Sequence, residues 1–239
     1  MADLIIRIDQ EEAITPQVMR ALRDAIIRVE LPPGAVISEA DIARRFGVSR
    51  QPVREAFIKL QEAGLLSIRP QRATRVQRIS VSEVMNARFV REAVEAAVAR
   101  EAAEVRPPGL TARLLALIEG QERAAAAEDG PLFLRLDEAF HRALAEGIDR
   151  DFAWTVLEGI KAQMDRVRFL SFSGATPLPD LIRQHRAILD GIAEGDPARA
   201  EAAMRLHLRE ILASLPKIAE AHPDYFEAEA TRHPRASAA

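Results

Sequence analysis

The chain has 239 residues, of which 48% are hydrophobic and 29% are charged, and its formal net charge is −3. This composition is typical of a globular protein with one large or two modest domains, and it excludes a disordered or fibrous chain. The absence of cysteine excludes disulfides, thiolate catalysis and cysteine-ligated metals, so any metal must be bound by imidazole and carboxylate groups.

The sequence shows no membrane or export segment. Its longest stretch without a charged residue runs from Phe169 to Pro179, well short of the ~18 apolar residues of a membrane span. The first residues include Asp3 and lack the basic segment and apolar run of a secretory signal. We therefore expect a cytoplasmic protein that does not bind the membrane.

Charge is divided unevenly along the chain. Residues 1–78 carry a net charge of +3, and residues 79–239 carry a net charge of −6. Between residues 44 and 78, nine basic residues stand against two acidic ones. A concentrated basic stripe indicates a polyanionic partner, although a run of charge can also be a solvated face.

Residues 1–78 predict a winged helix-turn-helix domain. Apolar residues at helical spacing over 15–30 predict a first helix. Two further helices are expected after it, with Ser38 capping the first of them and Ser49 the second. Gly47 lies between these two helices and predicts the sharp turn of a helix-turn-helix.

Two short strands are expected to follow the third helix and to form a β wing. They cover residues 65–69 and 74–78, around a loop that contains Arg72.

The second helix of a helix-turn-helix lies in the major groove of DNA, where arginine pairs with guanine and glutamine with adenine. The residues that we predict to contact DNA lie at the start of this helix, at the end of the preceding helix and in the wing: Arg44, Arg45, Ser49, Arg50, Gln51, Arg54 and Arg72. In the alternative interpretation, these arginines only solubilise a generic small domain.

The rest of the chain predicts an all-α helical bundle over residues 79–222, so the fold class is mainly α. The helical patterns cover residues 80–104, 111–128, 131–147, 150–172, 180–193 and 197–221. Residues 223–239 have no periodic pattern, and we expect a loose C-terminal tail there.

Four polar side chains fall on or beside the apolar faces of three of these helices. Asp137 and His141 are one turn apart on one helix, His185 lies among the apolar residues of a second, and His207 lies at the edge of the apolar face of a third. A single inward histidine is more often a satisfied core residue, but a buried carboxylate is costly unless it is paired or binds a metal. Together they predict a divalent metal site, for zinc first and otherwise for nickel, iron or manganese.

Several segments resemble a known family. Residues 31–60, LPPGAVISEADIARRFGVSRQPVREAFIKL, are similar to the winged-helix signature of the GntR family of bacterial transcription regulators. The motifs DEAFH at 137–141, QHRAIL at 184–189, GDPARA at 195–200 and MRLHL at 204–208 resemble, in order, the FCD effector domain of its FadR subgroup.

The resemblance implies a homodimer that reads a palindromic operator, with Arg50 and Arg54 as principal DNA contacts. It implies a divalent metal on the four polar side chains and a small carboxylate effector bound beside it. Arg88 aligns with an arginine that can grip the effector, yet on a helical wheel it falls with Arg91, Glu92 and Glu95 on the polar side of its helix. In the wing, Ala73 stands where the family usually has glycine.

Our leading hypothesis is a DNA-binding transcription regulator whose operator affinity depends on a small organic acid bound at the metal. We favour a repressor over an activator. One alternative is a metalloenzyme that uses the Asp/His₃ site for hydrolysis, although no further Glu or His is spaced as a general base. Another is a regulator whose metal is purely structural or is itself the signal.

Overall fold

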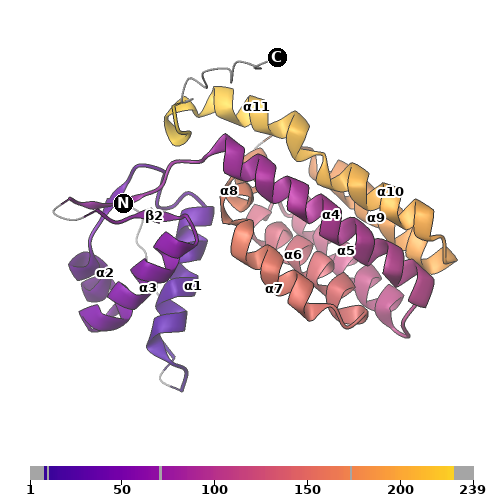
Figure 1. Cartoon of the computed structure of the whole chain (residues 1–239), viewed down its shortest axis with the longest axis horizontal. Helices are drawn as coiled ribbons and strands as arrows, with labels where there is room; N and C mark the ends of the chain where they lie inside the picture. The colour runs from indigo at the N-terminus through magenta and orange to yellow at the C-terminus, as the bar shows by residue number, and fades with distance from the viewer. Residues whose placement is uncertain (1–7, 10, 70–71, 173, 229–239) are drawn as a thin grey trace, which may run out of the picture.

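The computed structural model describes residues 8–9, 11–69, 72–172 and 174–228. It confirms a mainly helical chain that combines a winged helix-turn-helix with an all-helical bundle. In Figure 1 the smaller N-terminal body lies to the left of the bundle, and the chain passes from one to the other just before the long helix α4.

The N-terminal body consists of three helices and a small antiparallel sheet: α1 (Ile14–Ile27), β1 (Val36–Ile37), α2 (Glu39–Phe46), α3 (Arg50–Glu62), β2 (Leu66–Ser67) and β3 (Thr74–Val76). The strand order is β1-β3-β2, and β2 and β3 are the predicted wing strands. Strand β1 was not predicted, because a strand of two residues is too short to show an alternating hydrophobic pattern. Pro70 and Gln71, which belong to the wing loop, lie outside the described residues.

The turn between α2 and α3 forms for the reasons that the sequence indicates. The Ser38 hydroxyl accepts a hydrogen bond from the backbone N–H of Asp41 at 3.1 Å, and Gly47 ends α2 with φ of +65°, a left-handed conformation that favours glycine. Ser49 is the N-cap residue of α3, as the sequence predicts, but its hydroxyl makes no capping hydrogen bond. The buried Phe57 and Leu60 fix the inner face of α3 and leave its opposite face exposed.

The C-terminal body contains the remaining helices: α4 (Val81–Val105), α5 (Leu110–Ala126), α6 (Gly130–Gly147), α7 (Asp151–Ile160), α8 (Ala162–Ser171), α9 (Leu178–Glu194), α10 (Pro197–Leu208) and α11 (Ile211–Ala221). Figure 1 shows α4 running along the bundle with α10 and α9 beside it.

Two helices expected to be continuous are each broken in two. The predicted helix 150–172 breaks at Lys161, whose buried ammonium group is held by Glu138 and Asp165. The predicted helix 197–221 breaks at residues 209–210, where backbone hydrogen bonds shorten to three residues, as from Glu210 N to His207 O. Neither junction contains a proline, so the local sequence does not predict that the helix ends there.

Helices α9 and α10 approach each other closely at Gly191. A Cβ atom at this glycine would lie 2.7 Å from the backbone nitrogen of Ala200, so only glycine permits the contact without a backbone shift. These two helices carry His185 and His207. The close approach therefore helps to bring the two imidazoles together.

The segment after α11 packs on the connection between the two bodies. A short 3₁₀ helix spans Pro223–Tyr225, and Phe226 is buried and forms a parallel β-bridge with Ile79. The prediction of a loose tail is therefore wrong for residues 223–226, because Phe226 buries an aromatic ring there. Residues 229–239 of the predicted tail lie outside the described residues.

None of the helices in the described part of the chain combines the length and apolar character needed to span a membrane.

Candidate functional site

Four polar side chains meet inside the helical bundle. Asp137 and His141 come from α6, His185 from α9 and His207 from the last turn of α10, and one possible ligand atom from each lies within 4.8 Å of the others. The Nε2 atom of His207 is 3.1 Å from that of His141 and 3.2 Å from that of His185. The structure thus brings together the four residues that the sequence singled out.

The opposite nitrogen of each imidazole faces an oxygen acceptor. His185 Nδ1 is 2.7 Å from Gln121 Oε1, and His207 Nδ1 is 3.0 Å from Gln184 Oε1. His141 Nδ1 is 2.5 Å from a carboxylate oxygen of Glu95. A neutral ring that keeps its proton on Nδ1 presents the Nε2 lone pair, so these acceptors direct lone pairs toward a common centre.

Burial sets the charges of the cluster. Desolvation lowers the pKa of His185 to about 3 and that of His207 well below its usual value. Burial opposes ionisation of Asp137 as well, but Arg168 and the histidines outweigh it and hold the pKa of this carboxyl below its usual range. At neutral pH, His185 and His207 are therefore neutral and Asp137 is ionised, which is the state that a metal ion requires of such ligands.

The cluster fits a divalent cation. Asp137 Oδ1 is buried and accepts no hydrogen bond from any described residue. Its neighbours at this position include His185 Nε2, 3.5 Å away, which offers another lone pair. An unpaired carboxylate oxygen beside inward imidazole lone pairs is costly unless a cation balances them, and one oxygen with three nitrogens suits zinc or a similar transition metal.

A small cavity of about 40 Å³ borders the cluster. His207 forms part of its wall, and two cationic side chains, Arg91 and Arg168, line it together with Ser171 and Thr176. The guanidinium group of Arg168 also hydrogen-bonds Asp137. An anionic group in this cavity would meet two arginines and His207, although the acidic Glu210 also lines it.

Helix α4 contributes residues that the sequence analysis assigned to its polar side. Arg91, Glu92 and Glu95 are in fact buried, so this polar side of the helix does not face solvent. Ion pairs at one-turn spacing, such as Arg91 with Glu95 at 2.5 Å, make this burial possible. Arg88 pairs with Glu92 and does not line the cavity. Arg91, three residues later on the same helix, does line it.

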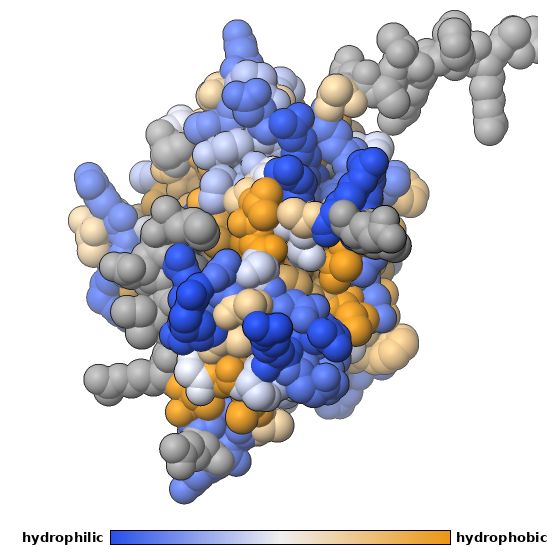
Figure 2. All heavy atoms as spheres, turned by 90° about the vertical axis from the view of Figure 1, so that its left-hand side faces the viewer, coloured by the Kyte–Doolittle hydropathy of each residue, from blue (hydrophilic) through white to orange (hydrophobic). Residues whose placement is uncertain are grey.

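The exposed face of α3 presents the predicted DNA-contacting side chains. Ser49, Arg50, Gln51 and Arg54 are exposed at its start, and Arg54 forms a 3.2 Å ion pair with Glu39. Arg44 and Arg45, at the end of α2, are also exposed. Figure 2 looks onto this end of the molecule and shows strongly hydrophilic side chains gathered around smaller apolar patches.

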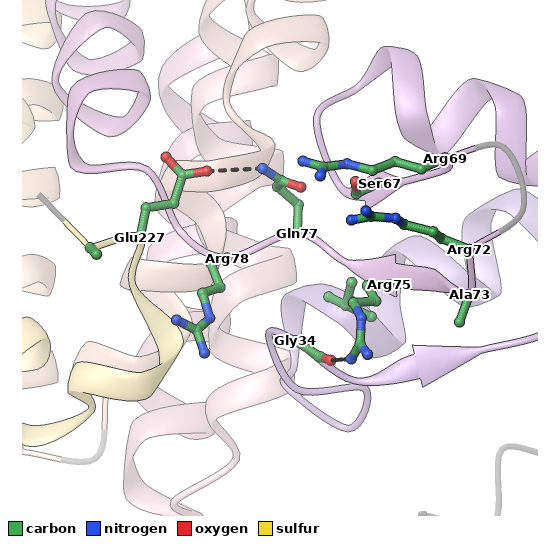
Figure 3. Close-up of a pocket in the computed structure, with 11 residues that line it drawn as sticks. Gly34, Ser67, Arg69, Arg72, Ala73, Arg75, Gln77, Arg78 and Glu227 are labelled. Atoms are coloured by element: carbon green, nitrogen blue, oxygen red, sulfur yellow. Dashed lines mark hydrogen bonds between the residues drawn. The ribbon is translucent and has the colours of Figure 1, made fainter. Parts of the chain in front are cut away.

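A second basic surface lies beside the wing. A hollow of about 600 Å³ is lined by four arginines, Arg69, Arg72, Arg75 and Arg78. In Figure 3, Arg69 and Arg72 extend side by side across the hollow, while Arg75 turns toward Gly34 and donates a hydrogen bond to its carbonyl oxygen at 3.1 Å. The predicted contact Arg72 therefore lies among the arginines of the basic stripe that the sequence shows between residues 44 and 78.

Family models match both bodies. The model "Bacterial regulatory proteins, gntR family" matches residues 14–76, and the FCD domain model matches residues 87–210.

Relatives agree with these matches over almost the whole chain. The "HTH-type transcriptional repressor RspR" of Escherichia coli (strain K12) is 39% identical over 223 residues, which cover 93% of this chain and 98% of the relative. A Paenarthrobacter nicotinovorans protein named "Probable D-xylose utilization operon transcriptional repressor" is 32% identical over 77% of this chain and 80% of its own length.

Solved structures show the same fold. McbR/YncC of E. coli superposes with a TM-score of 0.76 at 21% identity, over 86% of this chain and 98% of that one. A GntR transcriptional regulator of Rhodococcus sp. RHA1 gives a TM-score of 0.70 at 25% identity, over 87% of this chain and 98% of that one. The chain belongs to the GntR family of bacterial transcription regulators, in the subgroup with an FCD domain, and is a DNA-binding regulator and not an enzyme.

Proposed function

We propose that this regulator is a repressor whose affinity for its operator changes when a small organic acid binds at a divalent metal in the FCD domain. The observation that carries the proposal is the convergence of three imidazole Nε2 atoms and Asp137 beside a cavity with two arginines. DNA binding falls to residues 1–78, and effector binding and dimerisation to residues 79–222.

The exposed start of α3 supports direct reading of bases. Arg50 and Arg54 offer bidentate donors for guanine, and Gln51 offers the donor and acceptor that adenine requires. Arg44, Arg45 and Ser49 flank this surface, and Arg72 extends it into the wing, where phosphates or the minor groove are in reach. A homodimer would place two such surfaces on a palindromic operator.

The dimer itself finds support in the outer surface of the FCD domain. Helix α4 exposes 67% of Phe89, and α10 exposes 65% of Leu206. Large apolar side chains this exposed are often covered by a partner. As a regulator of chromosomal DNA, the protein is expected to work in the cytoplasm.

Asp137, His141, His185 and His207 would hold the metal, with zinc the first candidate and nickel, iron or manganese also compatible with these ligands. A bound divalent ion supplies a positive centre on which a carboxylate oxygen can coordinate. Arg168 and Arg91 are placed to bind a second oxygen or a further acidic group of the effector. Arg88, the effector-binding residue that the resemblance implies, would act indirectly through its ion pair with Glu92.

Two alternatives remain, a purely structural metal and a metal that is itself the signal. The buried cations favour an effector, because Arg91 and Arg168 both line a cavity beside the cluster, and a structural metal needs no such lining. The relative named as a repressor in E. coli supports repression over activation.

Elemental analysis and footprinting test the proposal together. The purified full-length protein is expected to carry about one divalent ion per chain and to protect a palindromic sequence upstream of its own gene. Wild-type protein that binds no divalent metal would refute the effector part of the proposal. Protection of a non-palindromic single site would refute the proposal that a homodimer binds the operator.

A further inference from the structure

Helix α8 contacts both the DNA-binding body and the histidine cluster. Gln163 donates a hydrogen bond to the carbonyl oxygen of Gly64, just after α3, at 2.7 Å. Arg166 donates to the carbonyl oxygen of Gln77, in the connection to α4, at 2.6 Å. Arg168, less than one turn further along the same helix, hydrogen-bonds Asp137. A movement at the cluster can therefore reach the DNA-binding body through one short helix.

Charged groups of alternating sign continue this contact into α1. Asp165 Oδ1 is 3.6 Å from Arg168 Nη1, and Asp165 Oδ2 is 3.3 Å from Arg23 Nη2. Asp165 also accepts a hydrogen bond from Lys161 at 2.7 Å. Asp137 and Asp165 are fully buried, so each depends on its cationic partners, and the loss of one partner must be compensated by another.

Arg168 lies between the cavity and the cluster, where both ligands of the site would act on it. The cavity it lines, at about 40 Å³, has room for a few water molecules, and a carboxylic acid of several heavy atoms requires a lining side chain to move. A divalent cation on Asp137 would also repel the guanidinium group that now hydrogen-bonds this carboxylate. An acid in the cavity would attract the same guanidinium group by its negative charge, so both ligands weaken the contact between Arg168 and Asp137.

We propose that Arg168 and Asp165 form a charge relay that transmits occupancy of the histidine cluster to Arg23 of the DNA-binding body. This inference rests on the proposed function, because it gives the route by which the metal and the acid alter DNA affinity. When Arg168 leaves Asp137, its contact with Asp165 changes as well, and Asp165 relies more on Arg23 and Lys161. The tighter pair with Arg23 then holds α1, and the helix-turn-helix packed on it, in a different orientation against α8.

Such coupling must be reciprocal, which makes it measurable with the metal alone. If Zn²⁺ changes the affinity for DNA by some factor, DNA changes the affinity for Zn²⁺ by the same factor. The full-length protein is titrated with Zn²⁺ by calorimetry, with and without saturating duplex DNA from upstream of its gene. The ratio of the two dissociation constants is the coupling factor.

The decisive variant is Arg23→Gln, which lies in the DNA-binding body and does not touch the cluster. Its matched control is Arg20→Gln, on the same helix, where the arginine pairs with Glu12 of its own body. We expect a coupling factor of about five or more for the wild type and for Arg20→Gln. For Arg23→Gln we expect a factor within about two-fold of unity.

Wild-type coupling in Arg23→Gln would overturn the relay while leaving the proposed function intact. A wild type that binds Zn²⁺ with a coupling factor of unity would overturn the relay alone, because an acid at the metal can still act on DNA binding. A wild type that binds no divalent metal would refute the proposed function and the relay with it.

A second measurement needs no DNA, so it tests the relay even if Arg23→Gln has lost DNA binding. Because the chain has no cysteine, Lys59→Cys and Glu119→Cys place one spin label on each body at exposed positions. Zn²⁺ is expected to shift the distance between the labels, and Arg23→Gln to remove the shift. A protein that binds Zn²⁺ without any shift would contradict the relay.

Discussion

A carboxylate oxygen of Glu95 lies 2.5 Å from Nδ1 of His141, and the same carboxylate is held by Arg91 on the preceding turn of α4. Burial disfavours the ionised carboxylate, but Arg91 and His141 outweigh this and lower the pKa of Glu95 to about 2. Glu95 is therefore ionised at neutral pH and orients the imidazole with Nε2 toward the cluster. This pair joins the longest helix of the FCD domain to the candidate metal centre.

Glu95→Gln is expected to weaken Zn²⁺ binding by about 10- to 100-fold, because it removes the charge that orients His141 and strengthens it as a ligand. Calorimetric titration with Zn²⁺ measures the effect, with circular dichroism to verify the fold. Glu104→Gln is the matched control, since Glu104 lies on the same helix and pairs with Arg100 at the surface. Equal Zn²⁺ affinity for both variants would show that Glu95 does not act on the cluster.

His185→Ala is expected to purify without stoichiometric metal, because it removes one of the four converging ligand atoms. Elemental analysis of the purified protein is the measurement. His222→Ala serves as control, since His222 stacks on Tyr225 outside the cluster and should leave the metal content unchanged. A full complement of metal in His185→Ala would place the ion elsewhere.

The double variant Arg50→Ala, Arg54→Ala is expected to lose at least about 30-fold in operator affinity, since each arginine offers a base contact of about 1–3 kcal/mol. Fluorescence anisotropy with a labelled operator duplex measures the loss. Arg183→Ala removes an exposed arginine from α9, outside the DNA-binding body, and should bind as the wild type does. Unchanged affinity of the double variant would refute the role of α3 as recognition helix.

Acid is expected to destabilise the metal-free protein between pH 7 and pH 5. Burial lowers the pKa of His185 from 6.5 to about 3, so below pH ~6.5 the unfolded chain binds a proton that the folded chain does not. The free energy of unfolding therefore falls as the pH drops through 6.5 toward 3, by about 2 kcal/mol for this residue at pH 5. Urea unfolding at several pH values measures it, and His185→Gln should reduce the dependence; an identical dependence in both proteins would contradict the account.

Gly191→Ala is expected to destabilise the FCD domain by about 1–3 kcal/mol, because its Cβ would press on the backbone of Ala200. Zn²⁺ affinity should fall too, since α9 and α10 carry His185 and His207. Gly159→Ala is the control, because its Cβ meets no atom within 4 Å and alanine favours a helix. Thermal unfolding compares the two, and a Gly191→Ala protein as stable as Gly159→Ala would show that α9 and α10 can separate freely.

Much of the fold followed from local signals. Ser38 and Gly47 mark the ends of α2 by cap chemistry that acts within a few residues, and the structure has both. The breaks at Lys161 and at residues 209–210 did not follow, because they depend on partners elsewhere in the bundle, such as Glu138 for Lys161. Phe226 likewise packs against Ile79, a residue far away in the sequence.

The candidate site divides in the same way. The sequence indicates the four cluster residues because polar side chains interrupt the apolar face of a helix there: Asp137, His141, His185 and His207. Glu95 did not stand out, because Arg91, Glu92 and Glu95 together look like a solvated face until their ion pairs and buried positions are known. The one available signal was a run of opposite charges at spacings of four residues, Arg88 with Glu92 and Arg91 with Glu95, which is equally common on exposed helices.

Occupancy of the cluster of Asp137 and the three histidines is proposed to set the affinity for the operator. The most direct test measures operator binding by wild-type protein, metal-loaded and metal-free, against a panel of small carboxylic acids. We expect at least one acid to change the dissociation constant by about five-fold or more in metal-loaded protein, and none to do so in metal-free protein or in His185→Ala. An acid response that persists without metal, or in His185→Ala, would contradict the claim.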